Sequence, residues 1–541
     1  MKKIAIYDTT LRDGAQAEGV SFSLEDKIRI ARRLDAFGLD YIEGGFAGSN
    51  PKDMEFFGRM ASEKLQHARL TAFGSTRRAN RTTAEDPVVQ AMLKAATPVV
   101  AVFGKSWTLH VRDVLRTSEE ENLEMIADSV RHLKEHGREV IYDAEHFFDG
   151  YKDSPRYALR TLQAAAAAGA DCVVLCDTNG GTLPHEIHSI TSEVMRALGS
   201  VAVGIHAHND SGCGVANTLE AVRAGAVHVQ GTINGIGERC GNANLCSIIA
   251  NLVLKLGCQC SGAGNLRELK ALSEFVYELA NMIPNSKAPY VGDSAFAHKA
   301  GMHVDGVRKN PRSFEHVDPE AVGNRRRILI SELSGTSNVF LKAVEMGFRV
   351  DRSSPEIKEI LTRLEKLEKQ GYEFEAAEAS FKLLIQKVLH EHRPFFELGG
   401  FRVIVEKREK DEPAVSEAVI KVRVGEDVEH TVGEGCGPVD ALNVALRRAL
   451  TRFYPQVEDV VLTDYRVRIL DPEHATGAKT RVLVESSDGA RRWSTVGVSE
   501  NIIEASWEAL VDSLEYKLFL DNRPGEGQGS ERRGETSGKE L

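Results

Sequence analysis

The stretch "DCVVLCDTNGGTLPHEIHSITSEVMRALGSVAVGIHAH", residues 171–208, contains two short apolar runs on either side of a longer amphipathic segment. The runs are typical of buried strands and the segment between them of a helix, so the stretch predicts a strand–helix–strand unit. Eight such consecutive units predict a closed parallel (β/α)8 TIM barrel of the α/β class, and an open doubly wound sheet is the less favoured alternative. The predicted strands are 4–8, 39–45, 69–74, 97–104, 139–145, 171–177, 201–208 and 227–234.

The sequence changes character twice after the barrel, becoming helical from about residue 262 and rich in strands from about 395. Two segments of the last part repeat one another, "TVGEGCGPVDALNVALRRAL" (431–450) and "TVGVSENIIEASWEALVDSL" (495–514). Each copy follows short alternating strands and enters an amphipathic helix, which predicts one α+β domain with an internal repeat. We therefore divide the chain into a barrel (1–261), helical subdomains (262–394), a C-terminal α+β domain (395–520) and a disordered tail (521–541), which has almost no apolar residues.

The composition of the 541 residues excludes several classes of protein. A formal charge of −11 argues against a nucleic-acid-binding protein, which would carry a basic patch or stripe. No run approaches the ~18 apolar residues that cross a bilayer, and the start, "MKKIAIYDTTLRDG", turns polar too early for a signal peptide. The eight cysteines include no C-x-x-C pair, so neither a disulfide framework nor a zinc knuckle is expected. We expect a soluble, cytoplasmic protein with no nucleic-acid or membrane partner.

Polar residues gather at the predicted carboxyl ends of six strands, where barrel enzymes place their chemistry. His206 and His208 are two apart in a predicted strand, so both imidazoles point to the same face. With the carboxylate of Asp13 they form a set that can hold a divalent ion with open positions. Two hydrogen-bonded histidines at a strand end are the less favoured alternative, because so many polar groups converge there. The residues at these ends are Arg12, Asp13, Glu43, Glu145, Asp177, Thr178, His206, His208, Asn234, Glu238, Arg239 and Asn242.

Four motifs resemble the 2-isopropylmalate, homocitrate and citramalate synthases: "YDTTLRDGAQAEG", "GIHAHNDSGCGVANTLEAV", "NGIGERCGNANL" and "AFAHKAGMHVDG". The resemblance implies a metal-dependent barrel enzyme that condenses acetyl-CoA with a 2-oxo acid. "DTTLRDGAQAEGVSFS" and "EGGFAGSNPKD" are most similar to the longer form of citramalate synthase. This similarity implies pyruvate as the acceptor, (R)-citramalate and CoA as products, and the first step of a pyruvate-based isoleucine route. The alternative is 2-isopropylmalate synthase, which uses 2-oxoisovalerate and more often carries Glu where Ala15 stands.

The resemblance also implies roles for the residues at the strand ends. Asp13, His206, His208 and Asn242 would hold the divalent metal, which would be Mg²⁺, Mn²⁺ or Zn²⁺. The ion would polarise the keto group of the 2-oxo acid. Arg12 would bind the substrate and stabilise the alkoxide that develops as the carbon–carbon bond forms.

Three further side chains are expected at the substrates. Glu43 would bind substrate, or pair with Arg12 in a salt bridge. Thr178 is a candidate donor to the carboxylate of the 2-oxo acid, or else it caps the loop after the sixth strand. Glu145 would deprotonate the acetyl methyl group or orient the thioester, although a lone glutamate at a strand end is more often an ion-pair partner.

His303 resembles a family histidine that a subdomain inserts into the active site, often from the partner subunit. Spacing alone does not distinguish it from His298 or His316. The family often has a tyrosine that cooperates with this histidine, whereas the local sequence "RSFEHVD" offers Phe314, which has no hydroxyl group. The proton relay is therefore expected to differ if Phe314 occupies that place.

The C-terminal repeat resembles the regulatory domain of the family. This implies a homodimer and feedback by an amino acid, which is isoleucine if the product is citramalate and leucine if it is isopropylmalate. The "TVG" segments, with Gly433 and Gly497, are predicted to be turns whose N–H groups lie near helix N-termini and could hold the effector carboxylate. Alternatively, these glycines only make turns.

Two other functional classes remain open. Lyases such as hydroxymethylglutaryl-CoA lyase share the barrel and the metal set but typically lack a long C-terminal extension. A metal-stabilised ligand-binding protein would require Arg12 and Glu145 to be merely structural. Release of CoA thiol from acetyl-CoA and pyruvate would separate a synthase from both.

Overall fold

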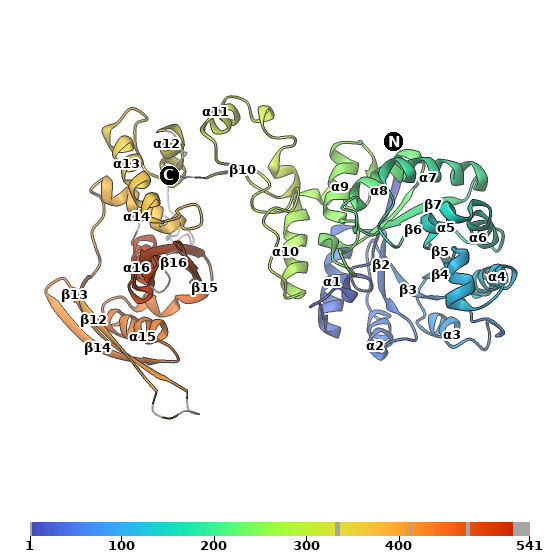
Figure 1. Ribbon diagram of the computed structural model, residues 1–541, viewed down its shortest axis with the longest axis horizontal. Coiled ribbons are helices and arrows are strands. Elements are labelled where there is room, and N and C mark those ends of the chain that lie inside the picture. The colour runs from blue at the N-terminus through green and yellow to red at the C-terminus, as the bar shows by residue number, and fades with distance from the viewer. Residues whose placement is uncertain (1–2, 330–335, 408, 410–412, 472–476, 523–541) are drawn as a thin grey trace, which may run out of the picture. The chain divides into compact units, whose positions relative to one another are not determined.

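The computed structural model describes residues 3–329, 336–407, 409, 413–471 and 477–522 (Figure 1). These residues form two compact units. The first consists of Met1–Phe296 and Glu315–Arg326, and the second of Ala297–Phe314 and Arg327–Leu541. Within the described ranges, none of the helices combines the length and the apolar character needed to span a membrane.

Eight parallel strands form a closed barrel in the first unit, which confirms the predicted (β/α)8 fold. β1 pairs with β8 through Ala5 and His228 and with β2 through Tyr7 and Tyr41, so the sheet closes on itself. β8 is shorter than predicted, because residues 233–235 form a 3-10 turn. The strands are β1 (Lys3–Asp8), β2 (Tyr41–Phe46), β3 (Arg69–Ser75), β4 (Val99–Lys105), β5 (Glu139–Glu145), β6 (Cys172–Asp177), β7 (Ala202–Ala207) and β8 (His228–Gly231); a short β9 (Gln259–Cys260) also pairs with β1.

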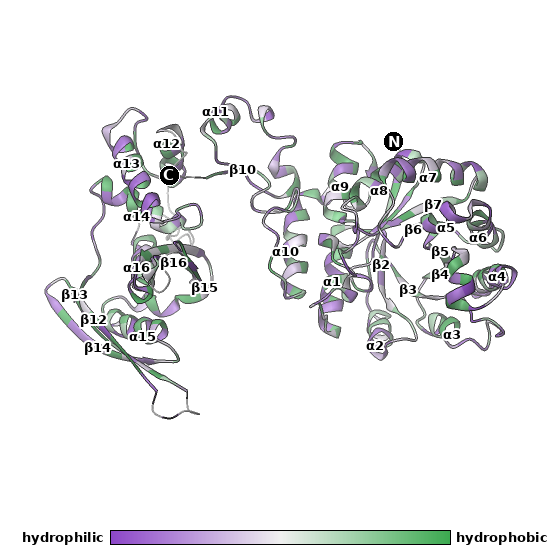
Figure 2. Ribbon diagram, viewed as in Figure 1, coloured by the Kyte–Doolittle hydropathy of each residue, from purple (hydrophilic) through white to green (hydrophobic). Residues whose placement is uncertain are grey.

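Amphipathic helices follow the strands. Figure 2 shows this for α4, whose ribbon carries both hydrophilic and hydrophobic residues. α1 begins after Ser23, which forms a capping box with Asp26, and ends at Gly38 with φ of 93°, as the sequence predicts. β5 is followed by two helices where one is predicted. The helices are α1 (Leu24–Phe37), α2 (Pro51–Met60), α3 (Pro87–Lys94), α4 (Glu119–Glu135), α5 (Phe147–Asp153), α6 (Pro155–Ala167), α7 (Pro184–Leu198), α8 (Gly214–Ala224), α9 (Leu245–Leu254) and α10 (Leu269–Leu279).

The barrel interior is filled by side chains from alternate strand positions. Tyr7, Tyr41 and Val174 belong to one buried cluster there. Gly204 leaves room for the ring of His228, because a Cβ at this position would lie 2.9 Å from its Cδ2 atom. A filled interior leaves the loops at the strand ends as the place for chemistry.

The second unit contains helices followed by two similar three-stranded antiparallel sheets, which confirms the predicted repeat. Each sheet is followed by one helix. The first part comprises β10 (Ala297–His298), α11 (Gly301–Lys309), β11 (Arg327–Ile328), α12 (Thr336–Glu345), α13 (Pro355–Gln370) and α14 (Glu378–Val388). The repeat comprises β12 (Glu397–Glu406), β13 (Val415–Val424), β14 (Asp427–Gly435) and α15 (Pro438–Thr451), then β15 (Val461–Ile469), β16 (Thr480–Ser487), β17 (Arg492–Ser499) and α16 (Ile502–Asp521). Nearly all of the predicted tail, from residue 523, lies outside the described residues.

The two "TVG" segments lie inside strands β14 and β17, so the prediction that they form turns is wrong. A Cβ at Gly433 would lie 2.5 Å from the backbone nitrogen of Ala445 in α15. One at Gly497 would lie 2.0 Å from the carbonyl oxygen of Ala505 in α16. Both glycines therefore let a helix backbone pack directly against its sheet, and the turn geometry expected for a carboxylate site is not present there.

Candidate active site

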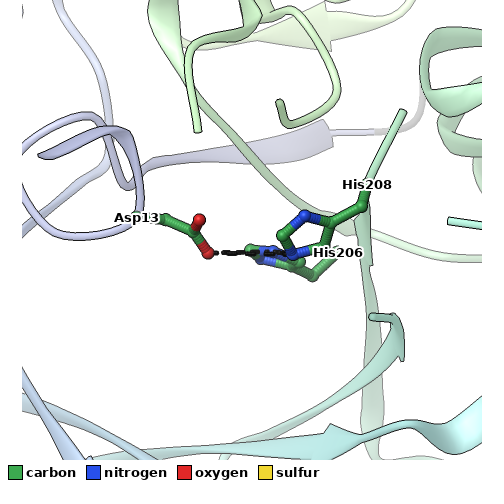
Figure 3. Close-up of side chains that lie close together, drawn as sticks. All are labelled: Asp13, His206 and His208. Atoms are coloured by element: carbon green, nitrogen blue, oxygen red, sulfur yellow. Dashed lines mark hydrogen bonds and ion pairs between the residues drawn. The ribbon is translucent and has the colours of Figure 1, made fainter. Parts of the chain in front are cut away.

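The three predicted metal ligands converge at the carboxyl end of the barrel (Figure 3). Asp13 follows β1, and His206 and His208 lie at the end of β7. The Nε2 atoms of His206 and His208 are 3.3 Å apart and lie 3.5 and 3.9 Å from Oδ2 of Asp13. All three side chains are buried, and they form the one cluster of His, Cys, Asp and Glu suited to a metal among the residues that the structure describes.

The protonation states of this cluster suit a cation. Burial lowers the pKa of His208 to about 4 and also lowers the pKa of His206, so both imidazoles are neutral at pH 7. Burial by itself would raise the pKa of Asp13, but the nearby Arg12 guanidinium and the two histidines outweigh it and lower this pKa to about 2. One carboxylate and two neutral imidazoles are suitable ligands for a divalent ion.

Asn242 reaches this cluster because its loop pairs with the end of β7. The backbone N–H of Asn209 donates to the carbonyl of Gly241 at 2.9 Å, and His208 and Asn242 form a β-bridge. The side-chain amide of Asn242 donates to Oδ1 of Asp13 at 3.0 Å. Its Oδ1 atom is buried and has no hydrogen-bond partner among the described residues, so this oxygen is available to an ion. The residues present therefore fit a divalent metal.

Arg12 is fixed beside the cluster by three contacts. Its Nε donates to Glu43 at 2.7 Å, and its Nη1 donates to Asp13 at 2.9 Å. The guanidinium also lies over the ring of Phe73, 3.9 Å from the centroid. Burial would lower the pKa of Arg12, but the attraction of Glu43 and Asp13 outweighs it and raises the pKa above its usual value. Arg12 is thus a permanent cation in a fixed orientation.

Glu43 lies behind Arg12, has no exposed surface and is not among the residues that line the cavity. One carboxylate oxygen accepts from the hydroxyl of Tyr7 at 2.7 Å, and the other accepts from Thr9 and Arg12. A contact between Glu43 and the substrate stays a prediction. Its position supports the alternative, a salt bridge that orients Arg12.

Glu145 and Thr178 both line the cavity beside the cluster. Glu145 forms an ion pair with Lys105, which lies opposite it on β4. The hydroxyl oxygen of Thr178 accepts a hydrogen bond from the backbone N–H of His146 at 2.9 Å. Among the described residues no hydrogen bond uses its O–H as the donor, so this group can donate to a substrate.

The cavity has a volume of about 230 Å³ and an aromatic wall that the strand-end pattern does not predict. Phe46, Phe73 and Phe103 come from β2, β3 and β4, and the last two rings are stacked with centroids 5.2 Å apart. Asp143 also lines the cavity. It stands two residues before Glu145, so the alternation of strand side chains contains a signal for it.

Two predicted strand-end residues have local structural roles. Asp177 accepts a hydrogen bond from the hydroxyl of Thr182 at 2.8 Å, within its own loop. Asn234 donates to the carbonyl of Ser273 at 2.9 Å. Neither residue lines the cavity, whereas Glu238 and Arg239, in the loop that follows β8, do.

His303 lies on α11 in the second unit, where its ring stacks on Phe314 with centroids 4.3 Å apart. Phe314 is 41% exposed, and its phenyl ring has no hydroxyl group to donate or accept a proton. The catalytic role of His303 stays a prediction.

Three family models match the sequence over most of its length. The HMGL-like model matches residues 3–276, the homocitrate synthase post-HMGL domain-like model residues 290–372, and the LeuA allosteric (dimerisation) domain residues 375–518. The chain is 56% identical over 524 residues to an (R)-citramalate synthase of Aquifex aeolicus, covering 97% of this chain and 99% of the relative.

Other relatives are similar over comparable lengths. An (R)-citramalate synthase of Geobacter sulfurreducens is 55% identical, covering 96% of this chain and 98% of the relative. A probable 2-isopropylmalate synthase of Methanopyrus kandleri is 34% identical, covering 94% of this chain and 97% of the relative. These matches confirm the resemblance carried by the four motifs, and the chain belongs to the family of the 2-isopropylmalate, homocitrate and citramalate synthases.

Proposed function

We propose that the protein condenses acetyl-CoA with pyruvate to give (R)-citramalate and CoA. The observation that carries this proposal is the buried cluster of Asp13, His206 and His208, with Arg12 fixed beside it in a small cavity. The relatives named (R)-citramalate synthase, which match almost the whole chain, support the choice of substrates. In the reaction the acetyl methyl group forms a bond to the keto carbon, and water cleaves the thioester to release CoA.

The residues of this chain divide the chemistry between them. A divalent ion, when bound, supplies Lewis-acid polarisation of the keto group of a chelating 2-oxo acid. Arg12 directs its remaining N–H groups to the oxygen on which negative charge develops. Glu145, held by Lys105, takes a proton from the acetyl methyl group. The hydroxyl group of Thr178 donates a hydrogen bond to the carboxylate of the acceptor.

The aromatic wall favours a small acceptor side chain. Phe46, Phe73 and Phe103 restrict the space beside the metal cluster. Each additional methylene of an acceptor changes the free energy of discrimination by only ~1–3 kcal/mol. The kcat/KM values for pyruvate and 2-oxoisovalerate should therefore differ by a factor that an assay can measure. The second of these acceptors would make the protein a 2-isopropylmalate synthase.

The test is the release of CoA thiol with a panel of 2-oxo acids. We expect the highest kcat/KM with pyruvate and a lower value with 2-oxoisovalerate, after reconstitution with Mg²⁺, Mn²⁺ or Zn²⁺ in turn. A higher value with 2-oxoisovalerate would transfer the proposal to 2-isopropylmalate synthesis. Absence of thiol release with every acceptor, together with cleavage of a 3-hydroxyacyl-CoA, would show a lyase instead.

We further infer that the C-terminal repeat forms a homodimer and mediates inhibition by isoleucine. The match to a LeuA allosteric (dimerisation) domain supports this role. Val432 and Val496 occupy equivalent positions in the repeat, yet Val432 is 44% exposed and Val496 only 1%. α14 packs on the second sheet at Val496, so the same face of the first sheet is left without this cover. We expect a second copy of the chain to cover it.

The dimer is tested by the variant Val432→Asp in the full chain, measured by sedimentation. We expect this variant to be a monomer. The matched control is Val405→Asp in β12, which lies on the opposite face of the same sheet and should stay dimeric. Isoleucine at millimolar concentration should inhibit the wild type. An enzyme that ignores both isoleucine and leucine would make the domain purely structural.

A further inference from the structure

We propose that Gln230 and Asp143 are positioning residues that fix the ring of His206 in the tautomer able to bind a metal through Nε2. Neither residue is a ligand in the cluster described above. Gln230 lies on β8 and is fully buried, and Asp143 lies on β5 and is 3% exposed. The inference rests on the metal site of the proposed function.

The first link joins His206 to Gln230. Nδ1 of His206 lies 2.9 Å from the side-chain oxygen Oε1 of Gln230. An amide oxygen can only accept a hydrogen bond, so Nδ1 must carry the proton of the neutral imidazole. Nε2 is then left without a proton, and this is the atom that faces His208 and Asp13. A metal-binding histidine needs this tautomer and this orientation.

The second link determines which way the amide of Gln230 points. Its Nε2 donates to Oδ1 of Asp143 at 3.0 Å across the barrel. If the amide were turned over, its oxygen would face the carboxyl group of Asp143 and its N–H would face Nδ1 of His206. Burial raises the pKa of Asp143 to about 8, so its carboxylate form predominates above that pH. This form disfavours the turned-over amide, because two acceptor oxygens would then meet in a buried site. Asp143 therefore acts on His206 through Gln230.

The other histidine lacks such support. Nδ1 of His208 is buried and has no hydrogen-bond partner among the described residues. His206 is thus the ligand whose ring the surrounding barrel holds in advance. Loss of Gln230 should leave both imidazoles without an orienting partner, and loss of such a partner typically lowers metal affinity about 10–100-fold.

The test measures Mn²⁺ and Zn²⁺ binding to the metal-free full-length protein, by competition with a chromophoric chelator. We expect Gln230→Leu and Asp143→Leu each to weaken binding at least tenfold. Asp143→Asn keeps the shape and an acceptor oxygen, so it should weaken binding less than threefold. Tyr41→Phe is the control for general destabilisation, because it removes a 2.7 Å hydrogen bond to Glu139 elsewhere in the barrel interior. It should leave the affinity unchanged.

A second readout needs no metal. In the ¹⁵N spectrum of histidine-labelled protein, the wild type should show His206 with the proton on Nδ1, and Gln230→Leu should show a mixture of tautomers. If Gln230→Leu does not fold, Asp143→Leu supplies the same comparison. Wild-type affinity in the folded leucine variants, or an equal loss in Tyr41→Phe, would overturn the inference. A wild type that binds neither ion would instead overturn the metal site itself.

Discussion

Replacing Arg12 by lysine tests whether the shape of this cation matters as well as its charge. The guanidinium bonds Glu43 at 2.7 Å and Asp13 at 2.9 Å at the same time, while its plane lies over Phe73. A lysine ammonium is a single point that lacks the planar fork. It can stay near one carboxylate, but it cannot bond both and also point N–H groups into the cavity.

The two expected losses differ in size. Removal of one preorganised donor to a developing negative charge lowers turnover by about 10²–10³, which corresponds to about 2.7–4 kcal/mol. For stability, the folded state of the variant loses one charge-assisted hydrogen bond. We expect the free energy of unfolding to fall by about 1.5 kcal/mol, because lysine still neutralises the buried carboxylate of Glu43. The loss of turnover should therefore exceed the loss of stability.

The assay is CoA thiol release at saturating acetyl-CoA and pyruvate, with the metal content and the unfolding free energy measured on the same samples. Arg239→Lys is the matched control. Arg239 also lines the cavity and also bonds a carboxylate, Asp210, at 2.8 and 2.9 Å, but its side chain is 40% exposed. It should lose less than about tenfold, since salt bridges near the surface contribute little. Unchanged turnover in Arg12→Lys, or an equal loss in Arg239→Lys, would remove Arg12 from the mechanism.

Three further outcomes are expected. His208→Ala removes a metal ligand and should lose most of the turnover. Wild-type protein treated with a chelator should regain activity when a divalent ion is added. Full turnover of His208→Ala after chelation would show that the predicted metal site is wrong. The pKa of His208 is lowered to about 4 and that of His206 is also lowered, so protons compete with the metal below the usual histidine pKa of about 6.5. The metal Kd should thus change little as pH falls from 7.5 to 5.5, whereas a marked weakening at pH 5.5, measured by chelator competition, would show ordinary histidines. Gly497→Ala places a Cβ 2.0 Å from the carbonyl oxygen of Ala505 and should lower the unfolding free energy by at least ~1–3 kcal/mol. Gly437→Ala, with open space around it, should lower it by no more than about 1 kcal/mol, the cost of alanine at the N-cap of α15. Equal stability of the two variants by denaturant titration would contradict the packing role.

The barrel was predictable because its signals are local and repeated. Apolar runs of strand length alternate with amphipathic segments eight times, and end signals such as Ser23 and Gly38 lie where the structure uses them. The errors fall where tertiary contacts override sequence patterns. The "TVG" segments look like turns because glycine is common in turns, but Gly433 and Gly497 lie in strands where a helix backbone approaches closely. Single-sequence patterns do not report such an approach.

Much of the metal site was predictable for a different reason. The carboxyl ends of parallel strands meet at one end of the barrel, so Asp13 and His206 converge although they lie far apart in the sequence. The supporting residues were not predicted. Gln230 and Asp143 look like ordinary strand positions, and their roles depend on which strand faces which across the barrel interior. That information lies in the closure of the sheet.

The C-terminal domain is less separable than its repeat suggests. Truncation after about residue 395 should abolish inhibition by the amino acid, because it removes both copies. It would also strip the second sheet from α14, whose Phe381 and Ile385 are buried in one cluster with Val496. Ser380 of the same helix donates to Asp512 at 2.7 Å and accepts from the backbone N–H of Val496 at 3.1 Å. A loss of activity in the truncated chain would therefore have two causes that this variant does not separate: the newly exposed face of α14 and the missing regulatory domain. Val432→Asp leaves this contact intact, so it separates the assembly of the dimer from the folding of the helices.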